Sequence, residues 1–134
     1  MDKYNNMKKE KFSIRKRLNS FRYAFNGFRI LFKEEHNSWI HLLAATGVLA
    51  AAIIFRISTT EWIAVIFAIG LVFTTELVNT AIEDISNFIS AEKNDRIKRI
   101  KDLSAAAVLI AALTALIIGL IVFVPKLAER CSGY

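Results

Sequence analysis

The chain has 134 residues, of which 54% are apolar and only one is proline, and its formal net charge is +6. This length suits one domain, which we place over residues 1–134. Because the apolar residues gather in three long blocks, the composition argues against an ordinary soluble domain. A single cysteine, Cys131, excludes an intrachain disulfide and has no nearby cysteine or histidine with which to bind a metal.

The basic residues are concentrated in two blocks. Ten of the 18 Lys and Arg residues precede Glu34, and five more lie between Lys93 and Lys101. Such blocks bind either nucleic acid or anionic lipid. Both blocks border apolar stretches, so lipid is the better interpretation and we expect no nucleic-acid partner.

Residues 12–34 are predicted to form an amphipathic surface helix. Apolar side chains recur there in steps of three and four, at Ile14, Leu18, Phe21, Phe25, Phe28 and Phe32. Basic and amide side chains fall between them, a pattern typical of a helix lying in a membrane interface. The alternative is a soluble amphipathic helix packed on a core.

Three stretches are long and apolar enough to span a membrane: residues 38–57, 62–85 and 103–124. The turn from Ser58 to Glu61 has the Ser-x-x-Glu pattern that starts helices. The third stretch is expected to stop at Pro125. Trp39 and Trp62 are expected to anchor helix ends at the membrane surface. The sequence therefore predicts an all-α integral membrane fold with three transmembrane helices and the surface helix.

The distribution of basic residues also predicts the topology. Fifteen lie in the N-terminal segment and the 86–102 connection, against three elsewhere. By the positive-inside rule both regions are cytoplasmic, and the second span then runs from outside to inside. This orientation puts Glu83 at the cytoplasmic mouth and Glu76 roughly 10 Å deeper.

Three polar residues interrupt the second span. Glu76, Asn79 and Glu83 have the spacing i, i+3 and i+7, which puts them on one helix face. An ionisable group inside a span costs several kcal/mol unless it faces protein or water, so such residues are candidates for function. The plainer alternatives are that Glu76 belongs to a hydrogen-bonded bundle core and that Glu83 is solvated.

Two charged pairs are expected to join this cluster at the cytoplasmic surface: Glu34-Glu35 and Lys101-Asp102. Carboxylates suit Mg²⁺ held together with substrate phosphates, and lysine suits phosphate. A remaining carboxylate near a lipid hydroxyl would serve as general base. Lys101 and Asp102 would alternatively be a charge pair at a helix start. We expect His41 to be an interface histidine with satisfied hydrogen bonds rather than a metal ligand.

No glycine-rich phosphate-binding loop occurs in the sequence, so a nucleotide site would be built from side chains on helices. The run Glu76-Leu-Val-Asn79-Thr-Ala-Ile-Glu83, followed by Lys101-Asp102-Leu-Ser-Ala-Ala-Ala-Val, resembles the bacterial membrane diacylglycerol kinases, a family that includes undecaprenol kinases. The resemblance covers about residues 15–125. The segment from Glu35 to His41 also resembles the family, the undecaprenol branch more than the other.

The resemblance implies a homotrimer in the bacterial inner membrane whose active sites form where subunits meet. It implies transfer of the γ-phosphate of ATP to a lipid hydroxyl, with Glu76 as general base and Asn79 orienting the site. Glu35 and Glu83 would hold Mg²⁺. The nucleotide would be contacted by these two carboxylates and by Lys16, Tyr23, Glu92, Lys101 and Asp102.

The chain departs from the family pattern at a few positions. Lys16 stands where the family has an arginine, and Asn87 stands where it has an aspartate. Trp39 or Ile40 replaces an arginine or glutamine. These departures concern the nucleotide contacts and the choice of lipid, diacylglycerol or undecaprenol, rather than the catalytic residues.

Two other classes of function compete with the lipid kinase. A small proton-coupled transporter subunit would use Glu76 as a relay, but it predicts polar residues through the full depth of a span. A non-catalytic membrane interaction protein would leave the Glu-Asn-Glu and Lys-Asp groups without a role.

Overall fold

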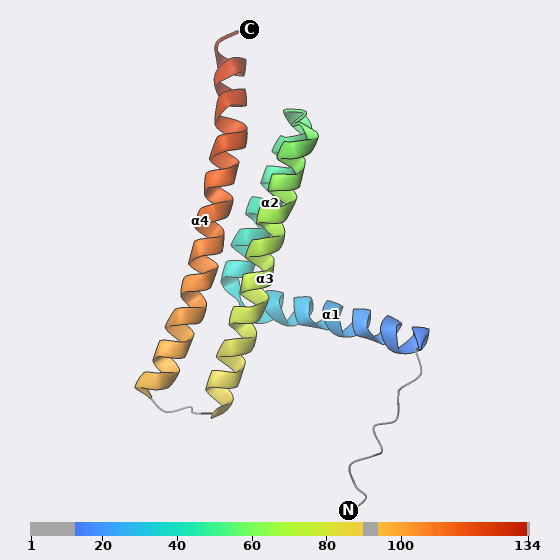
Figure 1. Cartoon of the computed structure of the whole chain (residues 1–134), viewed down its shortest axis with the longest axis vertical. Coiled ribbons are helices and arrows are strands. Elements are labelled where there is room, and N and C mark those ends of the chain that lie inside the picture. Colours follow the sequence, from blue (N-terminus) through green and yellow to red (C-terminus); the bar gives the residue numbers. More distant parts are fainter. Residues whose placement is uncertain (1–12, 90–93, 134) are drawn as a thin grey trace, which may run out of the picture.

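The computed structural model describes residues 13–89 and 94–133. They form four helices: α1 (Ile14–Glu34), α2 (His36–Ile54), α3 (Thr59–Ile89) and α4 (Asp95–Cys131). Figure 1 shows α2, α3 and α4 side by side, with α1 projecting sideways from them. No strand occurs in these two ranges. The all-α prediction, with a surface helix preceding three long helices, is confirmed.

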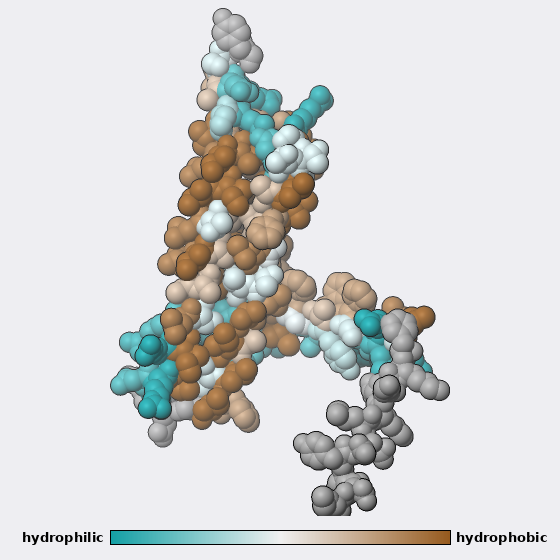
Figure 2. Space-filling model, viewed as in Figure 1, coloured by the Kyte–Doolittle hydropathy of each residue, from teal (hydrophilic) through white to brown (hydrophobic). Residues whose placement is uncertain are grey.

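α2, α3 and α4 are each long and apolar enough to cross a membrane. The 31 residues of α3 and the 37 of α4 correspond to lengths of about 46 and 55 Å, against a hydrocarbon core of about 30 Å. Figure 1 shows α1 joining the bundle above the lower ends of both helices, so these ends extend past the level of α1. Figure 2 shows apolar surface along the bundle between hydrophilic groups at its two ends.

The turn between α2 and α3 is tighter than expected, because α2 ends at Ile54 rather than at residue 57. Arg56 has a φ of 49°, in the left-handed region. The N–H of Ile57 donates to the carbonyl of Ala52, and that of Arg56 donates to the carbonyl of Ile53, both at 3.2 Å. This hydrogen-bond pattern is the Schellman motif, which satisfies the last carbonyls of a helix.

α3 begins as its sequence predicts. Ser58 and Glu61 form a capping box in which the Ser58 N–H donates to Glu61 Oε2 at 2.6 Å, and the Glu61 N–H lies 3.4 Å from Ser58 Oγ. Lys126 Nζ of α4 lies 3.1 Å from Glu61 Oε1. The capping box therefore also joins the start of α3 to the last turns of α4.

The expectation that the third helix stops at Pro125 is wrong, since α4 continues through this proline to Cys131. Membrane helices tolerate proline where neighbouring groups compensate for the lost backbone hydrogen bond. The residues around Pro125 pack against α2 and α3: Phe123 meets Phe55 edge to face, and Arg130 lies over the Phe55 ring. These contacts, together with the Lys126–Glu61 pair, hold the last turns of α4 in place.

α3 is the central helix, and one stripe on its surface organises the molecule. Its buried positions include Val65, Ala68, Val72, Glu76 and Asn79, in steps of three and four residues. α3 packs chiefly on α4 and less extensively on α2 and α1. The stripe is apolar as far as Val72 and becomes polar at Glu76, so the core of the bundle leads directly into the candidate site.

Candidate active site

The candidate site lies at the level where α1 joins the bundle, between the first turns of α2 and the C-terminal half of α3. Glu76 and Asn79 of α3 are buried there, with 3% and 8% of their surface exposed. Thr80 Oγ1 donates to the carbonyl of Glu76 at 3.0 Å, within the same helix. Both residues lie on one face of α3, as their i and i+3 spacing predicts, and this face is buried.

His41 of α2 faces Glu76 across the two helices. His41 Nε2 lies 2.9 Å from Glu76 Oε1. The ring is not turned so that an N–H points at the oxygen, and Oε1 therefore has no hydrogen-bond partner. The terminal torsion of a histidine is soft, so a small rotation of the ring aligns the two groups at this short distance. Such hydrogen bonds are often poorly aligned in the absence of substrate.

A second pair lies one helical turn away, toward the α1 end of the bundle. Ser38 precedes His41 by one turn on α2, and Asn79 follows Glu76 by one turn on α3. Because α2 and α3 run antiparallel, Ser38 and Asn79 lie at a similar level. Ser38 Oγ and Asn79 Oδ1 are both buried, and neither has a hydrogen-bond partner in the part of the chain that the structure describes. Unpaired buried polar atoms are rare and call for an explanation, such as a ligand that meets them.

Glu35 and Glu83 form the third level. Glu35 is the extended residue between α1 and α2. Burial raises the pKa of the Glu35 carboxyl above its ordinary value, and nearby carboxylates raise it further, in the order Glu83, Glu76, Glu34 and Asp84. This concentration of negative charge fits a cation. We call Glu35, Ser38 and His41 of the α2 side and Glu76, Asn79 and Glu83 of α3 the polar interface.

Trp39 stabilises the corner between α1 and α2 at which Glu35 lies. Its indole N–H donates to the carbonyl of Phe32 at 2.8 Å, and its ring lies 5.5 Å from the Phe32 ring. The N–H of Glu35 donates to the carbonyl of Leu31, and the carbonyl of Glu35 accepts from the N–H of Ser38. Trp39 remains 57% exposed, so it combines this corner contact with the predicted place at the surface.

The polar interface continues toward α4. Asn79 Nδ2 donates to Glu83 Oε1 at 3.4 Å. Lys101 Nζ of α4 donates to Asn87 Oδ1 at 3.2 Å, about one turn beyond Glu83 along α3. Asp102 is exposed beside Lys101. The tertiary structure therefore brings Lys101 to the same end of the bundle as the carboxylates.

Other predicted site residues are not brought to this cluster by the chain itself. Lys16 and Tyr23 lie on α1, which leads away from the bundle (Figure 1). Their positions are 19 and 12 residues before Glu35, or about 28 and 18 Å along a helix. Tyr23 is 74% exposed. Glu92 lies outside the described residues.

The fit to a metal ion rests on two carboxylates. Within residues 13–89 and 94–133, no group of three or more acidic, histidine or cysteine side chains has the arrangement of a metal site. Mg²⁺, however, is commonly held by one or two carboxylates, with substrate phosphates and water completing its shell. Glu35 and Glu83 have the chemistry for that role, and the carboxylates that raise the Glu35 pKa would be neutralised by a cation.

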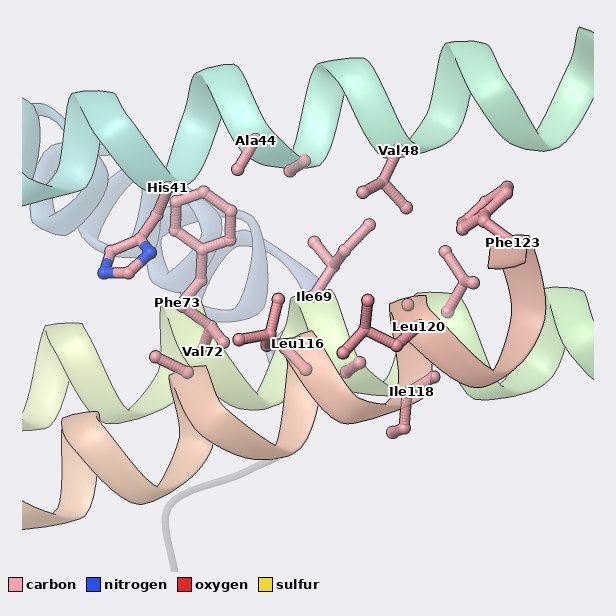
Figure 3. A pocket seen from close by; sticks show the side chains of 16 residues that line it. His41, Ala44, Val48, Ile69, Val72, Phe73, Leu116, Ile118, Leu120 and Phe123 are labelled. Carbon is pink, nitrogen blue, oxygen red and sulfur yellow. The ribbon is translucent and has the colours of Figure 1, made fainter. Parts of the chain in front are cut away.

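An apolar cavity of about 350 Å³ adjoins the polar interface (Figure 3). It lies between α2, α3 and α4 and extends from His41 toward Phe123. The side chains that line its middle are small or branched, among them Ala44, Val48, Ile69 and Leu116. Such a lining suits a hydrocarbon chain, whose polar end would then lie beside His41 and Glu76.

Two residues of the polar interface were missed by sequence reasoning. The sequence predicts that His41 is an interface histidine with satisfied hydrogen bonds, and it does not single out Ser38. A signal was present in the sequence: Glu35, Ser38 and His41 have the spacing i, i+3 and i+6, close to that of the three polar residues of α3. Two polar faces of matching period, each next to an apolar span, favour one shared site.

Comparisons with known proteins give the chain its family. Residues 22–123 match the model of the family described as prokaryotic diacylglycerol kinase. A protein of Bacillus subtilis named undecaprenol kinase is 37% identical over 108 residues, which cover 81% of this chain and 88% of that protein. A protein of Synechocystis sp. named diacylglycerol kinase is 32% identical over 109 residues, which cover 81% of this chain and 62% of that protein. The chain therefore belongs to the prokaryotic diacylglycerol kinase family, a family of membrane lipid kinases.

Proposed function

We propose that the protein transfers the γ-phosphate of MgATP to the primary hydroxyl of a membrane lipid. The observation that carries this proposal is the place of Glu76. This carboxylate is buried in the polar interface, 2.9 Å from His41, which lines the adjoining apolar cavity. A lipid chain in the cavity would bring its hydroxyl to Glu76, while the nucleotide approaches from the end of the bundle that holds Glu83 and Lys101.

Glu76 is the general base in this reaction, and Asn79 orients the reacting groups. Glu76 accepts the proton of the lipid hydroxyl as the hydroxyl oxygen forms a bond to the γ-phosphorus. The bond from that phosphorus to the β–γ bridging oxygen breaks, and ADP leaves. Phosphoryl transfer needs mainly positioning and charge stabilisation, so helices that fix a few side chains suffice.

Glu35 and Glu83 would hold Mg²⁺, and this ion would supply charge neutralisation on the phosphates. Lys101 and Asp102 contact the nucleotide phosphates from α4. Lys16, Tyr23 and Glu92 complete the nucleotide site. Because Lys16 and Tyr23 lie along a helix that leads away from the carboxylates of their own chain, we propose a homotrimer in which α1 serves the site of a neighbouring subunit.

The protein acts in the bacterial inner membrane, with its N-terminus and the 86–102 connection in the cytoplasm. The basic residues of α1 and of the start of α4 then face the anionic lipid of the cytoplasmic leaflet. In this orientation the polar interface opens to the compartment that contains ATP.

The direct test is phosphorylation by the purified protein, with radiolabelled ATP, Mg²⁺ and one lipid at a time. Diacylglycerol and undecaprenol are offered separately, since the two relatives carry both names. We expect a phosphorylated lipid from at least one of them. Glu76→Gln keeps the size of the side chain but cannot accept the proton, so kcat should fall by about 10²–10⁴ while nucleotide binding is kept.

Three results would contradict this proposal or a part of it. If neither lipid is phosphorylated by folded protein, the lipid kinase function is wrong. If Glu76→Gln turns over near the wild-type rate, Glu76 is a structural residue and another group is the base. A variant that loses nucleotide binding as well would place Glu76 with the metal ligands.

A further inference from the structure

We propose that His41 is a positioning residue for the reaction: it holds the Glu76 carboxylate in the orientation that receives the lipid hydroxyl. This inference rests on the proposed function and adds a residue of α2 to a catalytic group otherwise drawn from α3. The observation behind it is the 2.9 Å contact between His41 Nε2 and Glu76 Oε1 across the two helices.

The surroundings of His41 favour this role over simple packing. All the other described residues that line the adjoining cavity are apolar or glycine, so His41 is its one polar lining residue. Figure 3 shows the imidazole at one end of the cavity, with apolar side chains along the rest of it. Apolar residues would fill such a position at lower cost, because a polar group in an apolar site must be compensated by a partner.

Glu76 needs such a partner. Its side chain is 3% exposed, and Oε1 has no hydrogen-bond partner among the described groups. A buried carboxylate left unpaired costs free energy and can occupy several rotamers. With its proton on Nε2, the imidazole of His41 donates to Oε1 after a small rotation. The carboxylate then presents Oε2 to the substrate hydroxyl.

The position of His41 also ties the base to the cavity. A lipid chain that fills the cavity packs beside the imidazole and so favours one orientation of the ring. Correct positioning of a reacting group is worth about 10²-fold in rate for a displacement of 1 Å. Through His41, occupation of the cavity and orientation of Glu76 are coupled.

The experiment compares His41→Leu with His41→Gln in full-length protein, using the lipid that the wild type phosphorylates. The leucine variant removes the donor and should lower kcat by about 10–100-fold, with the KM for MgATP unchanged. The glutamine variant carries an amide N–H that reaches Oε1 and should retain activity within a few-fold of the wild type. Thr46→Val is the matched control, since Thr46 is an exposed α2 residue that bonds only to its own helix, at the carbonyl of Leu42.

A double variant separates positioning from a general structural effect. Because His41 acts through Glu76, adding His41→Leu to Glu76→Gln should produce no further loss of kcat. If kcat of the double variant is instead lower than that of Glu76→Gln by the factor that His41→Leu costs alone, His41 acts independently of Glu76 and the proposal is overturned. Wild-type kcat in His41→Leu, or equal losses in the leucine and glutamine variants, would also overturn it.

Melting temperature and elution volume in detergent check that each variant folds. If the leucine variant does not fold, His41→Asn replaces it, because its shorter side chain keeps an amide but does not reach Oε1, and the same loss is expected.

Failure of this inference is distinguishable from failure of the proposed function. An inactive Glu76→Gln beside a fully active His41→Leu removes only the role of His41, whereas an active Glu76→Gln removes the assigned base.

Discussion

At the scale of single residues, the site is defined by polar groups that lack partners within the described chain. Among the described residues, Ser38 Oγ and Asn79 Oδ1 are buried without hydrogen-bond partners, one helical turn from the Glu76 carboxylate that His41 faces. The remaining buried residues of the bundle are largely apolar, so few other side chains could serve these atoms as hydrogen-bond partners. Their concentration at one place favours a site for a polar ligand over a structural hydrogen-bond network.

The role of Glu83 as a metal ligand predicts a metal-dependent defect. Glu83→Gln should lower the rate at limiting Mg²⁺ by about 100-fold or more, because a metal ligand contributes several kcal/mol of charge stabilisation. Excess Mg²⁺ should recover part of this loss. The measurement is turnover against Mg²⁺ concentration, with Glu129→Gln as the control, since Glu129 is an exposed carboxylate near the C-terminal end of α4. A wild-type Mg²⁺ profile in Glu83→Gln would remove Glu83 from the site.

The pKa of Glu35 predicts how stability depends on pH without divalent ions. Burial and the neighbouring carboxylates raise this pKa in the folded protein. Between the unfolded and folded values the native state binds more protons, so stability falls as pH rises through this window. Glu35→Gln should flatten the dependence, and Mg²⁺ should offset the loss at higher pH. Thermal melting at several pH values tests this, and an unchanged slope in the variant would contradict it.

At the scale of the elements, short local motifs determine where each helix begins and ends. Asn94 caps α4 by accepting hydrogen bonds from the N–H groups of Arg96 and Ile97 at 2.9 and 3.4 Å. The α2–α3 turn combines the Schellman motif with the Ser58–Glu61 capping box. These caps fix the lengths of α2 and α3 and hence which turn of one helix faces which turn of the other.

The left-handed conformation of Arg56 predicts a difference in stability between two substitutions at this position. This region costs a residue with a Cβ atom roughly 1–2 kcal/mol, and glycine avoids most of that cost. Arg56→Gly should therefore be about 1 kcal/mol more stable than Arg56→Ala, which removes the same charge but keeps the strain. Thermal denaturation in detergent measures the difference. Equal melting temperatures in the two variants would show that the turn is not strained at this position.

At the scale of the whole molecule, the long helices extend between the two hydrophilic ends of the bundle (Figure 2). α3 and α4 extend past the level of α1, and their shared end holds Lys101 and the basic start of α4 (Figure 1). Many large apolar side chains on the outside of the bundle are exposed, such as Phe67 and Ile121. Exposed apolar surface of this extent suits contact with lipid and with other subunits.

The proposed orientation can be tested by cysteine labelling in intact cells. We expect Ser90→Cys, made together with Cys131→Ala, to be protected from an impermeant reagent because the 86–102 connection is cytoplasmic. The native Cys131 is exposed and lies near the opposite end of the bundle, so the unmodified chain serves as the positive control. Strong labelling of Ser90→Cys from outside would reverse the topology.

The sequence by itself determined the helical class, the three apolar helices and the polar face of α3, because periodicity and hydropathy are local properties of the chain. It also predicted the capping box, since Ser58 and Glu61 act within a single turn. It did not determine that α4 passes through Pro125, because contacts from other helices hold the following turns in place.

Only the tertiary structure decided what faces Glu76. The apolar pattern shows that this side of α3 is buried, but many partners would satisfy it equally well. The register between α2 and α3 depends on the corner at Trp39 and the turn at Arg56, which together bring His41 to 2.9 Å from the carboxylate. For the same reason, the separation of Lys16 and Tyr23 from the carboxylates became evident only once the direction of α1 was known, because helix direction depends on packing between elements rather than on periodicity within them.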